Sequence, residues 1–308
     1  MPRRKIGLPA RGESGSEAVV SPLGATLAVV GVTPSKSRGQ NFLVQPAIAE
    51  RIVAAAELSP RDEVVEIGPG LGILSERIAA RDIGRLTLVE LDRELATRLK
   101  RMFAGDLRVR VVQGDFVRAD LKEIFERPPV KVVGNLPFNV ASAIFRRLCD
   151  AHRRISTMVL MFQREVGERM RAAPGDRGYS ALSVFAALYW RIDLHFRVAA
   201  GNFFPRPKVD AEVLRLRAIP HLLFAPKEES AVAATVRACF SSPRKKIRNS
   251  LASGLGIEPR EAAAYLERAR IDSTLRPESL SAEDFVRLAR ALVETGALSP
   301  DKMGTRDA

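Results

Sequence analysis

Short runs rich in β-branched residues alternate with helical segments through the middle of the chain, and this alternation is the strongest constraint on its fold. The runs at 64–67, 86–91 and 130–133 are each followed, directly or after a short break, by a segment with helical spacing of apolar residues. Strands separated by helices predict βαβ units and a mostly parallel sheet. Further runs at 109–112, 157–162, 193–198 and 211–217 bring the predicted total to seven strands. The last run alternates apolar and polar residues, which predicts a half-buried or edge strand.

The strand pattern stops near Pro220, and helical patterning continues through 231–240, 245–251, 259–269 and 282–294. Ser281 and Asp284 form a capping-box-like start for the last of these helices. Residues 1–35 mix Pro, Gly, Ser and Arg without periodicity, which predicts a disordered N-terminal extension. We therefore expect an α/β domain at 36–222 and an all-helical domain at 223–308.

Charge and cysteine usage narrow the class of protein. The 308 residues carry 49 Lys and Arg against 36 Asp and Glu, a net charge of +13. This balance favours a nucleic-acid partner, although a GC-rich genome would produce a similar arginine bias. Cys149 and Cys239 form no disulfide or zinc pattern, and the three histidines lack metal-ligand spacing, so we expect no metal and a reducing, cytoplasmic location. No apolar run reaches the roughly eighteen residues that a membrane span needs.

A glycine-rich loop follows the first predicted strand, with Gly68, Gly70 and Gly72 close together. Glycines at this point let the backbone approach a ligand, and the next helix begins beside it. The loop suits a dinucleotide as well as S-adenosylmethionine, and a plain turn is the simpler alternative. Glu90 ends the second strand, where a carboxylate can accept both hydroxyl protons of a ribose. The two features together predict a cofactor that contains adenosine.

Polar residues also end the third and fourth strands. Asp115 can accept a hydrogen bond from an adenine amino group, or it can be the N-cap of the next helix, and both interpretations stay open. Asn135 begins the sequence Asn-Leu-Pro-Phe after the fourth strand. Because the carboxyl ends of parallel strands face one crevice, we expect Asn135 to lie near Gly68 and Glu90.

The Asn-Leu-Pro-Phe sequence is suited to an exocyclic adenine amine. The side-chain oxygen of Asn135 and the carbonyl of Leu136 can accept the two amine hydrogens and favour the nitrogen geometry that attacks a methyl group. Pro137 restricts Leu136 to an extended conformation. Phe138 offers a face on which the base can stack. The residues thus predict methyl transfer to an adenine amine, without a histidine base.

In their order and spacing, these motifs resemble the small-subunit ribosomal RNA adenine dimethyltransferases, relatives of the erythromycin-resistance RNA methylases and the mitochondrial transcription factors B. The resemblance runs from about residue 37 to 288 and includes the segments 39–43, 163–169, 179–184, 203–210 and 244–251. It implies a Rossmann-like, seven-stranded methyltransferase sheet with a smaller all-helical C-terminal domain. It also implies S-adenosylmethionine as the cofactor of the domain at 36–222.

The resemblance implies roles for particular residues. The residues expected to contact S-adenosylmethionine or its edge are Asn41, Leu43, Gly68, Gly70, Glu90, Asp115 and Asn135. Asn135 and Leu136 are expected to bind the target amine, while Phe138 and Phe203 hold the flipped base between them. The family usually has Tyr at the position of Phe138, so stacking is retained and a hydroxyl is lost.

Basic residues near aromatic ones complete the expected site. Arg206 and Lys208 lie in a Pro-rich loop beside Phe203, and the helical domain carries Arg244, Lys245, Lys246 and Arg248. We expect these cations to contact RNA phosphates, although such runs are often only a solvated face. The implied substrate is two adjacent adenosines near the 3′ end of small-subunit ribosomal RNA, within the immature small ribosomal subunit, and the enzyme is expected to act as a monomer. A large-subunit RNA adenine methylase and a non-catalytic RNA- or DNA-binding assembly or transcription factor are the alternatives.

Overall fold

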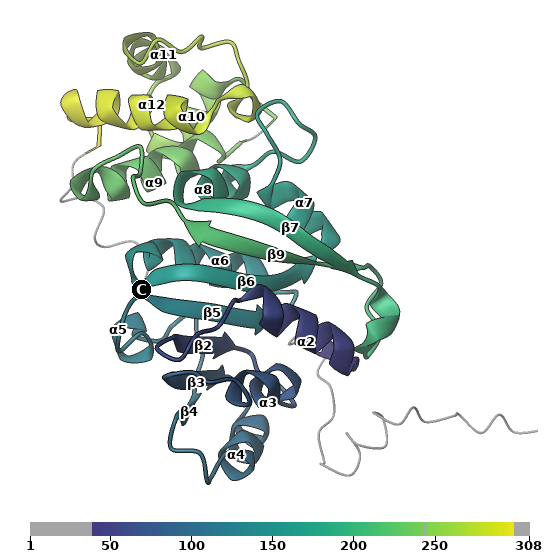
Figure 1. Ribbon diagram of the computed structural model, residues 1–308. Coiled ribbons are helices and arrows are strands. Elements are labelled where there is room, and N and C mark those ends of the chain that lie inside the picture. Colours follow the sequence, from purple (N-terminus) through teal and green to yellow (C-terminus); the bar gives the residue numbers. More distant parts are fainter. Residues whose placement is uncertain (1–38, 243, 299–308) are drawn as a thin grey trace, which may run out of the picture. The chain divides into compact units, whose positions relative to one another are not determined.

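The computed structural model describes residues 39–242 and 244–298, which lie in one compact unit (Figure 1). The extension predicted at 1–35 and the last ten residues of the helical domain lie outside the described residues. No helix in the described ranges is long and apolar enough to cross a membrane.

The elements, labelled as in Figure 1, follow the predicted alternation of strands and helices. The strands are β1 (Phe42–Leu43), β2 (Glu63–Ile67), β3 (Arg85–Glu90), β4 (Val109–Gln113), β5 (Val130–Asn135), β6 (Ile155–Gln163), β7 (Trp190–Val198), β8 (Phe203–Phe204) and β9 (Ala211–Ala218). The helices are α2 (Pro46–Ala55), α3 (Ile73–Ala79), α4 (Arg93–Met102), α5 (Leu121–Ile124), α6 (Ala141–Asp150), α7 (Arg164–Met170), α8 (Ala181–Tyr189), α9 (Glu229–Cys239), α10 (Ile247–Leu255), α11 (Pro259–Arg268) and α12 (Ala282–Glu294).

The seven-stranded sheet is confirmed, in the order β4-β3-β2-β5-β6-β9-β7. The strands from β4 to β6 pair in parallel, and β9 runs antiparallel to both β6 and β7. The prediction that 211–217 forms a half-buried or edge strand is wrong, because β9 lies between β6 and β7 and most of its residues are buried, including Glu212. The edge position belongs to β7 instead.

The order of the strands creates a crevice between β2 and β5. From β2 the chain adds β3 and β4 on one side, and later β5 and β6 on the other, so the direction of winding reverses between β2 and β5. Ligands bind at such a switch point in open α/β sheets. The two strands are close here: a Cβ atom at Gly134 would lie 2.9 Å from the carbonyl oxygen of Ile67. Glycine is therefore required just before Asn135.

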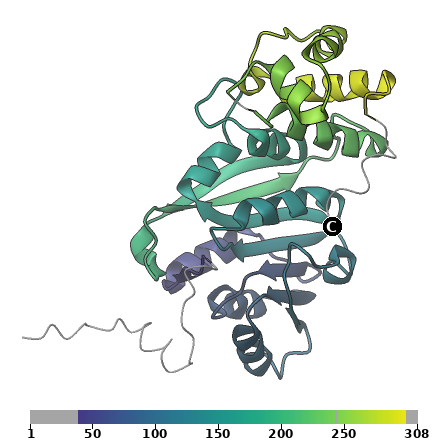
Figure 2. The same cartoon turned by 180° about the vertical axis from the view of Figure 1, so that it is seen from behind.

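Helices cover both faces of the sheet (Figure 2). One buried cluster joins the sheet to α2, α3 and α4, and a second joins it to α6 and α8. This second cluster continues into α9 and α12, so apolar packing is continuous from Phe162 to Phe285. The predicted capping box is present, since the Asp284 amide donates to the Ser281 hydroxyl. The boundary expected between 222 and 223 stays a prediction, because the same core extends across it.

The elements outside the sequence prediction include α2, α5, α8 and the small sheet of β1 with β8. Helix α8 is buried on most of its surface, so it lacks the polar stripe that marks an amphipathic helix. Strands β1 and β8 have two residues each, too few for a periodic pattern. They pair antiparallel, with Leu43 opposite Phe203. This pairing helps to hold the segment before α2 near the carboxyl ends of the parallel strands.

Candidate cofactor and adenine site

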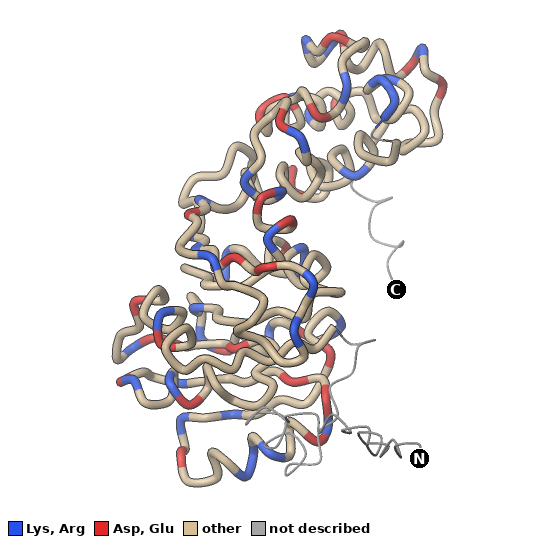
Figure 3. The backbone as a smooth tube through the Cα atoms, turned by 90° about the vertical axis from the view of Figure 1, so that its right-hand side faces the viewer, with Lys and Arg blue, Asp and Glu red and all other residues tan. Residues whose placement is uncertain are grey.

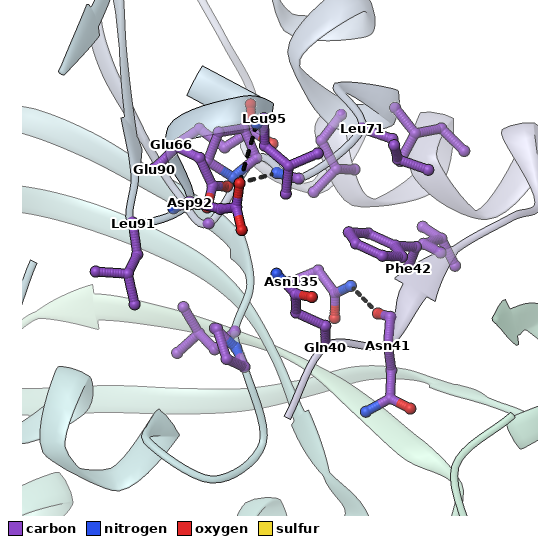
Figure 4. A pocket seen from close by; sticks show the side chains of 18 residues that line it. Gln40, Asn41, Phe42, Glu66, Leu71, Glu90, Leu91, Asp92, Leu95 and Asn135 are labelled. Carbon is purple, nitrogen blue, oxygen red and sulfur yellow. Dashed lines mark hydrogen bonds between the residues drawn. The ribbon is translucent and has the colours of Figure 1, made fainter. Parts of the chain in front are cut away.

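An open pocket lies at the carboxyl ends of β2, β3 and β5 (Figure 4). Seven of the predicted cofactor and amine residues line it: Asn41, Leu43, Gly68, Gly70, Glu90, Asn135 and Leu136. Sequence reasoning did not assign several other lining residues, among them Phe42, Glu66, Leu91 and Asp92. The switch point of the sheet therefore collects residues that are far apart in the chain.

The glycine loop adopts a backbone that favours glycine. Gly68, Gly70 and Gly72 have φ angles of +67°, +58° and +91°. The amide of Gly70 donates to Oε2 of Glu90 over 3.0 Å. A Cβ atom at Gly70 would lie 3.0 Å from the ring of Phe42. The loop is thus fixed between β3 and the segment before α2, with its backbone exposed to the pocket.

Glu90 is held rigidly at the end of β3. Its Oε2 accepts the Gly70 amide, and its Oε1 accepts the Asp92 amide over 2.9 Å. Burial raises the pKa of Glu90, and the two backbone hydrogen bonds lower it. A carboxylate has about four acceptor sites, so Glu90 can still accept further hydrogen bonds from a ligand. This geometry fits the predicted contact with a ribose.

Glu66 is a pocket residue to which the sequence assigned no role, although it begins the segment 66–72 that contains the glycine loop. Its exposed fraction is 1%, and the Ser75 hydroxyl donates to Oε2 over 2.6 Å. Burial raises the pKa of Glu66 to about 8; the Ser75 hydrogen bond lowers it and the charge of Glu90 raises it. The ion pairs within the described ranges include neither Glu66 nor Glu90. An acidic residue inside an otherwise apolar strand was the signal for it.

Asn135 presents an unsatisfied acceptor. Its Nδ2 donates to the carbonyl oxygen of Asn41 over 3.0 Å, which fixes the orientation of the amide (Figure 4). Its Oδ1 is buried and has no hydrogen-bond partner among the described residues. A buried acceptor without a donor is costly, roughly 1–3 kcal/mol, so a ligand donor at this position would be favourable.

Asp115 lies next to this pocket rather than among its lining residues. The Gly114 amide donates to the Glu90 carbonyl, which places Asp115 beside the end of β3. Its Oδ1 accepts the Val117 amide over 2.9 Å, and the side chain is 41% exposed. The N-cap alternative is wrong, because Asp120 caps the next helix, α5, and Asp115 caps only the turn before it. Contact with an adenine stays a prediction.

The two predicted base-stacking residues are neighbours. The ring centroids of Phe138 and Phe203 are 6.2 Å apart, and the rings are inclined at 64°. Parallel stacking on both faces of a base requires about 7 Å between the two rings, twice an aromatic contact distance. The structure thus brings the pair together, and one ring must turn for a base to enter between them.

The predicted RNA-contacting residues form two separate exposed groups. Arg206 and Lys208 lie in the loop between β8 and β9, and the other group lies at and just before the start of α10. Figure 3 shows Lys and Arg along both the sheet and the C-terminal helices. The members of the second group are Arg244, Lys245, Lys246 and Arg248.

The pocket residues fit S-adenosylmethionine. This molecule carries a positive sulfonium, a positive ammonium and a ribose, and the pocket supplies two buried carboxyl groups without a cationic partner in the described ranges. The free acceptor of Asn135 adds a place for the amine that receives the methyl group. Within the same ranges, no three acidic, His or Cys side chains are grouped as a metal site.

Comparisons with known proteins agree with the fold, which is that of a Rossmann-like methyltransferase. The chain matches the family model of ribosomal RNA adenine dimethylases over residues 33–294 and belongs to this family. It is therefore an S-adenosylmethionine-dependent enzyme, and the predicted family, fold class and cofactor are confirmed.

Relatives and solved structures cover most of the chain. A protein of Moorella thermoacetica named ribosomal RNA small subunit methyltransferase A is 41% identical over 288 residues, which span 90% of this chain and 99% of that relative. A protein of the same name from Methylococcus capsulatus is 41% identical, over 84% of this chain and 98% of the relative. The crystal structure of the 23S rRNA methyltransferase ErmE has a TM-score of 0.59 and 29% identity, over 82% of this chain and 100% of that chain. A dimethyladenosine transferase from Plasmodium falciparum shares the fold, with a TM-score of 0.69 and 23% identity, over 83% of this chain and 98% of that chain.

Proposed function

We propose that the protein transfers methyl groups from S-adenosylmethionine to the N6 amine of two adjacent adenosines in small-subunit ribosomal RNA, giving dimethyladenosine during ribosome biogenesis. The observation that carries the proposal is the buried Oδ1 of Asn135, which lacks a partner among the described residues and lines the pocket. The names and high coverage of the small-subunit relatives support the choice of RNA.

The amine is activated by position rather than by a base. One amine hydrogen donates to Oδ1 of Asn135 and the other to the carbonyl of Leu136. These acceptors favour a nitrogen lone pair aimed at the methyl group, and alignment of this kind supplies much of the rate. When bound, S-adenosylmethionine supplies a methyl group on positively charged sulfur. The amine proton then leaves to solvent, so no histidine is needed.

The remaining site residues hold the two substrates. Asn41, Leu43, Gly68, Gly70, Glu90 and Asp115 bind the cofactor, and Phe138 and Phe203 stack on the target base. An extruded or unpaired adenosine is required, because the amine is not accessible within a stacked helix. The loop with Arg206 and Lys208 and the cations of the helical region from 223 onward bind RNA phosphates.

The proposed partner is the immature small ribosomal subunit, and the proposed location is the cytoplasm. Cys149 and Cys239 are free and buried, which suits a reducing compartment. The proposed oligomeric state is a monomer.

Methyl transfer from labelled S-adenosylmethionine to immature small subunits tests the proposal. Purified protein should produce dimethyladenosine in the small-subunit RNA. Asn135→Ala should lower the rate roughly 10²–10³-fold, a loss comparable to that of one transition-state hydrogen bond in other enzymes. Asn202→Ala is the matched control, because the Asn202 amide donates locally to Ala199 outside the pocket. Label in large-subunit RNA alone, or undiminished transfer by Asn135→Ala, would contradict the proposal.

A further inference from the structure

Glu66 has a buried carboxyl group that plays no role in the methyl transfer proposed above. It lies on β2, in the middle of the strands that form the pocket. In the sheet register it is opposite Leu88 of β3 and Val133 of β5. Neighbouring strands are about 4.8 Å apart. Glu66 is thus close to both strands, whose ends carry Glu90 and Asn135.

The position of the donor sulfur follows from Glu90 at the end of β3 and Asn135 at the end of β5. The sulfur of S-adenosylmethionine is bonded both to the ribose carbon and to the methyl group that is transferred. If Glu90 binds the ribose and Asn135 binds the receiving amine, the sulfur lies between them. Glu66 is the acidic residue at the pocket end of the strand between these two side chains, while Glu63 lies at the other end of that strand.

No positive group of the protein compensates Glu66 in the described structure. The charged residues on the elements packed against it are Arg85 and Glu90 from β3, Asp92 just after it, Glu76 and Arg77 from α3, and Lys131 from β5. Arg85 begins β3 at the opposite end of the sheet and pairs with Glu126. Glu90 and Asp92 are acidic, and Glu76 is exposed. Arg77 donates to the Ile73 carbonyl, and Lys131 pairs with Asp62 at the opposite end of the sheet. The nearest compensating charge therefore has to come from a ligand.

We propose that Glu66 distinguishes the sulfonium donor from its thioether product, by releasing a proton to solvent when the donor binds and recovering one when the sulfur becomes neutral. The proposal rests on the proposed function for the place it gives to the sulfur. Burial keeps the carboxyl group mostly protonated at pH 7 in the free protein, since its pKa is about 8. A positive charge within about 4–6 Å lowers a carboxyl pKa by roughly 1–3 units.

The protons balance over one cycle. Donor binding removes one proton from Glu66, and the ionised carboxylate then faces the sulfonium. Transfer breaks the bond from sulfur to the methyl carbon and forms the bond from nitrogen to that carbon, and the amine loses its proton to solvent. The sulfur is left neutral, and Glu66 takes a proton back. The buried carboxylate thus binds the donor more tightly than the product.

Titration calorimetry measures this proton exchange directly. The full chain is titrated with S-adenosylmethionine and with S-adenosylhomocysteine at pH 7, in two buffers with different ionisation enthalpies. We expect close to one proton released per donor bound, and less than half as much with the product. In Glu66→Gln both values should approach zero, and the affinity ratio of donor to product should fall about tenfold or more. Equal proton release for the two ligands, or an unchanged ratio in folded Glu66→Gln, would overturn the proposal.

Ser75→Ala provides a second variant that keeps the carboxyl group. The Ser75 hydrogen bond lowers the pKa of Glu66, so its loss should move the midpoint of donor-linked proton release to higher pH. Ser156→Ala is the matched control, because the Ser156 hydroxyl donates to the Val130 carbonyl away from the pocket. A midpoint that does not move in Ser75→Ala, or that moves equally in the control, would count against Glu66 as the titrating group.

The outcomes separate this inference from the proposed function. Donor-specific proton release without methyl transfer to small-subunit RNA would contradict the proposed function and support the role of Glu66. Methyl transfer to that RNA with equal proton release for donor and product would support the proposed function and contradict the role of Glu66.

Discussion

Two fully buried carboxyl groups lie near the carboxyl ends of the parallel strands. Only one of them has positively charged partners in the described structure. Glu66 on β2 receives a single hydroxyl hydrogen bond, from Ser75. Glu212 on β9 has an exposed fraction of 0% and binds two guanidinium groups: Nη2 of Arg171 lies 2.6 Å from Oε2, and Nε of Arg197 lies 3.2 Å from Oε1. One carboxyl group is thus neutralised by the chain and the other is left for a ligand.

The difference indicates that Glu212 stabilises the fold, whereas Glu66 is available to bind a ligand. An ionised carboxyl group in a protein interior needs a positive partner or a proton. Around Glu212 even the backbone is adapted, since a Cβ atom at Gly167 would lie 2.7 Å from Oε2. Around Glu66 the pocket is open and the carboxyl group is kept neutral by its raised pKa. The same substitution should therefore have opposite effects on stability at the two positions.

Glu212→Gln should give the largest effect, a loss of about 4 kcal/mol in the free energy of unfolding. The substitution leaves the guanidinium of Arg171 without a countercharge, and breaking one side of a buried ion pair typically costs about 3–5 kcal/mol. Urea unfolding of both proteins at pH 7 measures the difference. A loss below about 1 kcal/mol would mean that water, rather than Glu212, compensates the arginines.

Glu66→Gln should do the reverse and stabilise the cofactor-free protein by about 3 kcal/mol at pH 7. At this pH the folded chain holds a proton on Glu66 that the unfolded chain has released, and glutamine removes this cost while keeping an acceptor for Ser75. The size of the effect follows from about 1.36 kcal/mol for each pH unit between the usual pKa of 4.5 and pH 7. Urea unfolding of dialysed protein provides the measurement, and a destabilised variant would place Glu66 with Glu212 as a structural acid.

The pH dependence of this difference should follow the pKa of Glu66. Because the folded value of about 8 lies above the usual value of 4.5, the folded chain holds a proton that the unfolded chain has lost between these two pH values. The wild-type free energy of unfolding should thus fall relative to Glu66→Gln as pH rises from about 4.5 to 8, by about 1.4 kcal/mol per unit. Below that window the difference should vanish, and above it should be constant. A difference that is independent of pH would assign the stabilisation to packing.

The sequence allowed the pocket to be located because periodicity and strand ends are local signals. Glu90 and Asn135 each follow a recognisable strand, and parallel strands bring their ends together. Glu66 and Glu212 escaped prediction for the opposite reason, because each stands inside a strand, where a charge suggests a solvent-facing side. In β9 that interpretation made an interior strand resemble an edge strand.

The partner of Asn135 could not have been found in this way. Its orientation depends on the carbonyl of Asn41, 94 residues away, which is brought close by the two-residue pairing of β1 with β8. Every residue has a backbone carbonyl, so the residue type does not indicate which carbonyl accepts the hydrogen bond. A strand of two residues is too short to show an alternating pattern. The resemblance to a family identified the segment at 39–43, while its contact with Asn135 became visible in the structure.

Arg197→Gln should give the smallest effect, no more than about 1 kcal/mol, because exposed ion pairs contribute little. The Arg197 side chain is 59% exposed, whereas that of Arg171 is 26% exposed and lies closer to Glu212. Arg217→Gln is the matched control: Arg217 pairs with Asp193 across the same two strands, and both side chains are about half exposed. Urea unfolding of the two variants should give similar small losses. A loss for Arg197→Gln that approaches that of Glu212→Gln would mean that both arginines are needed as partners of Glu212, and the two buried acids would then differ by two compensating charges rather than one.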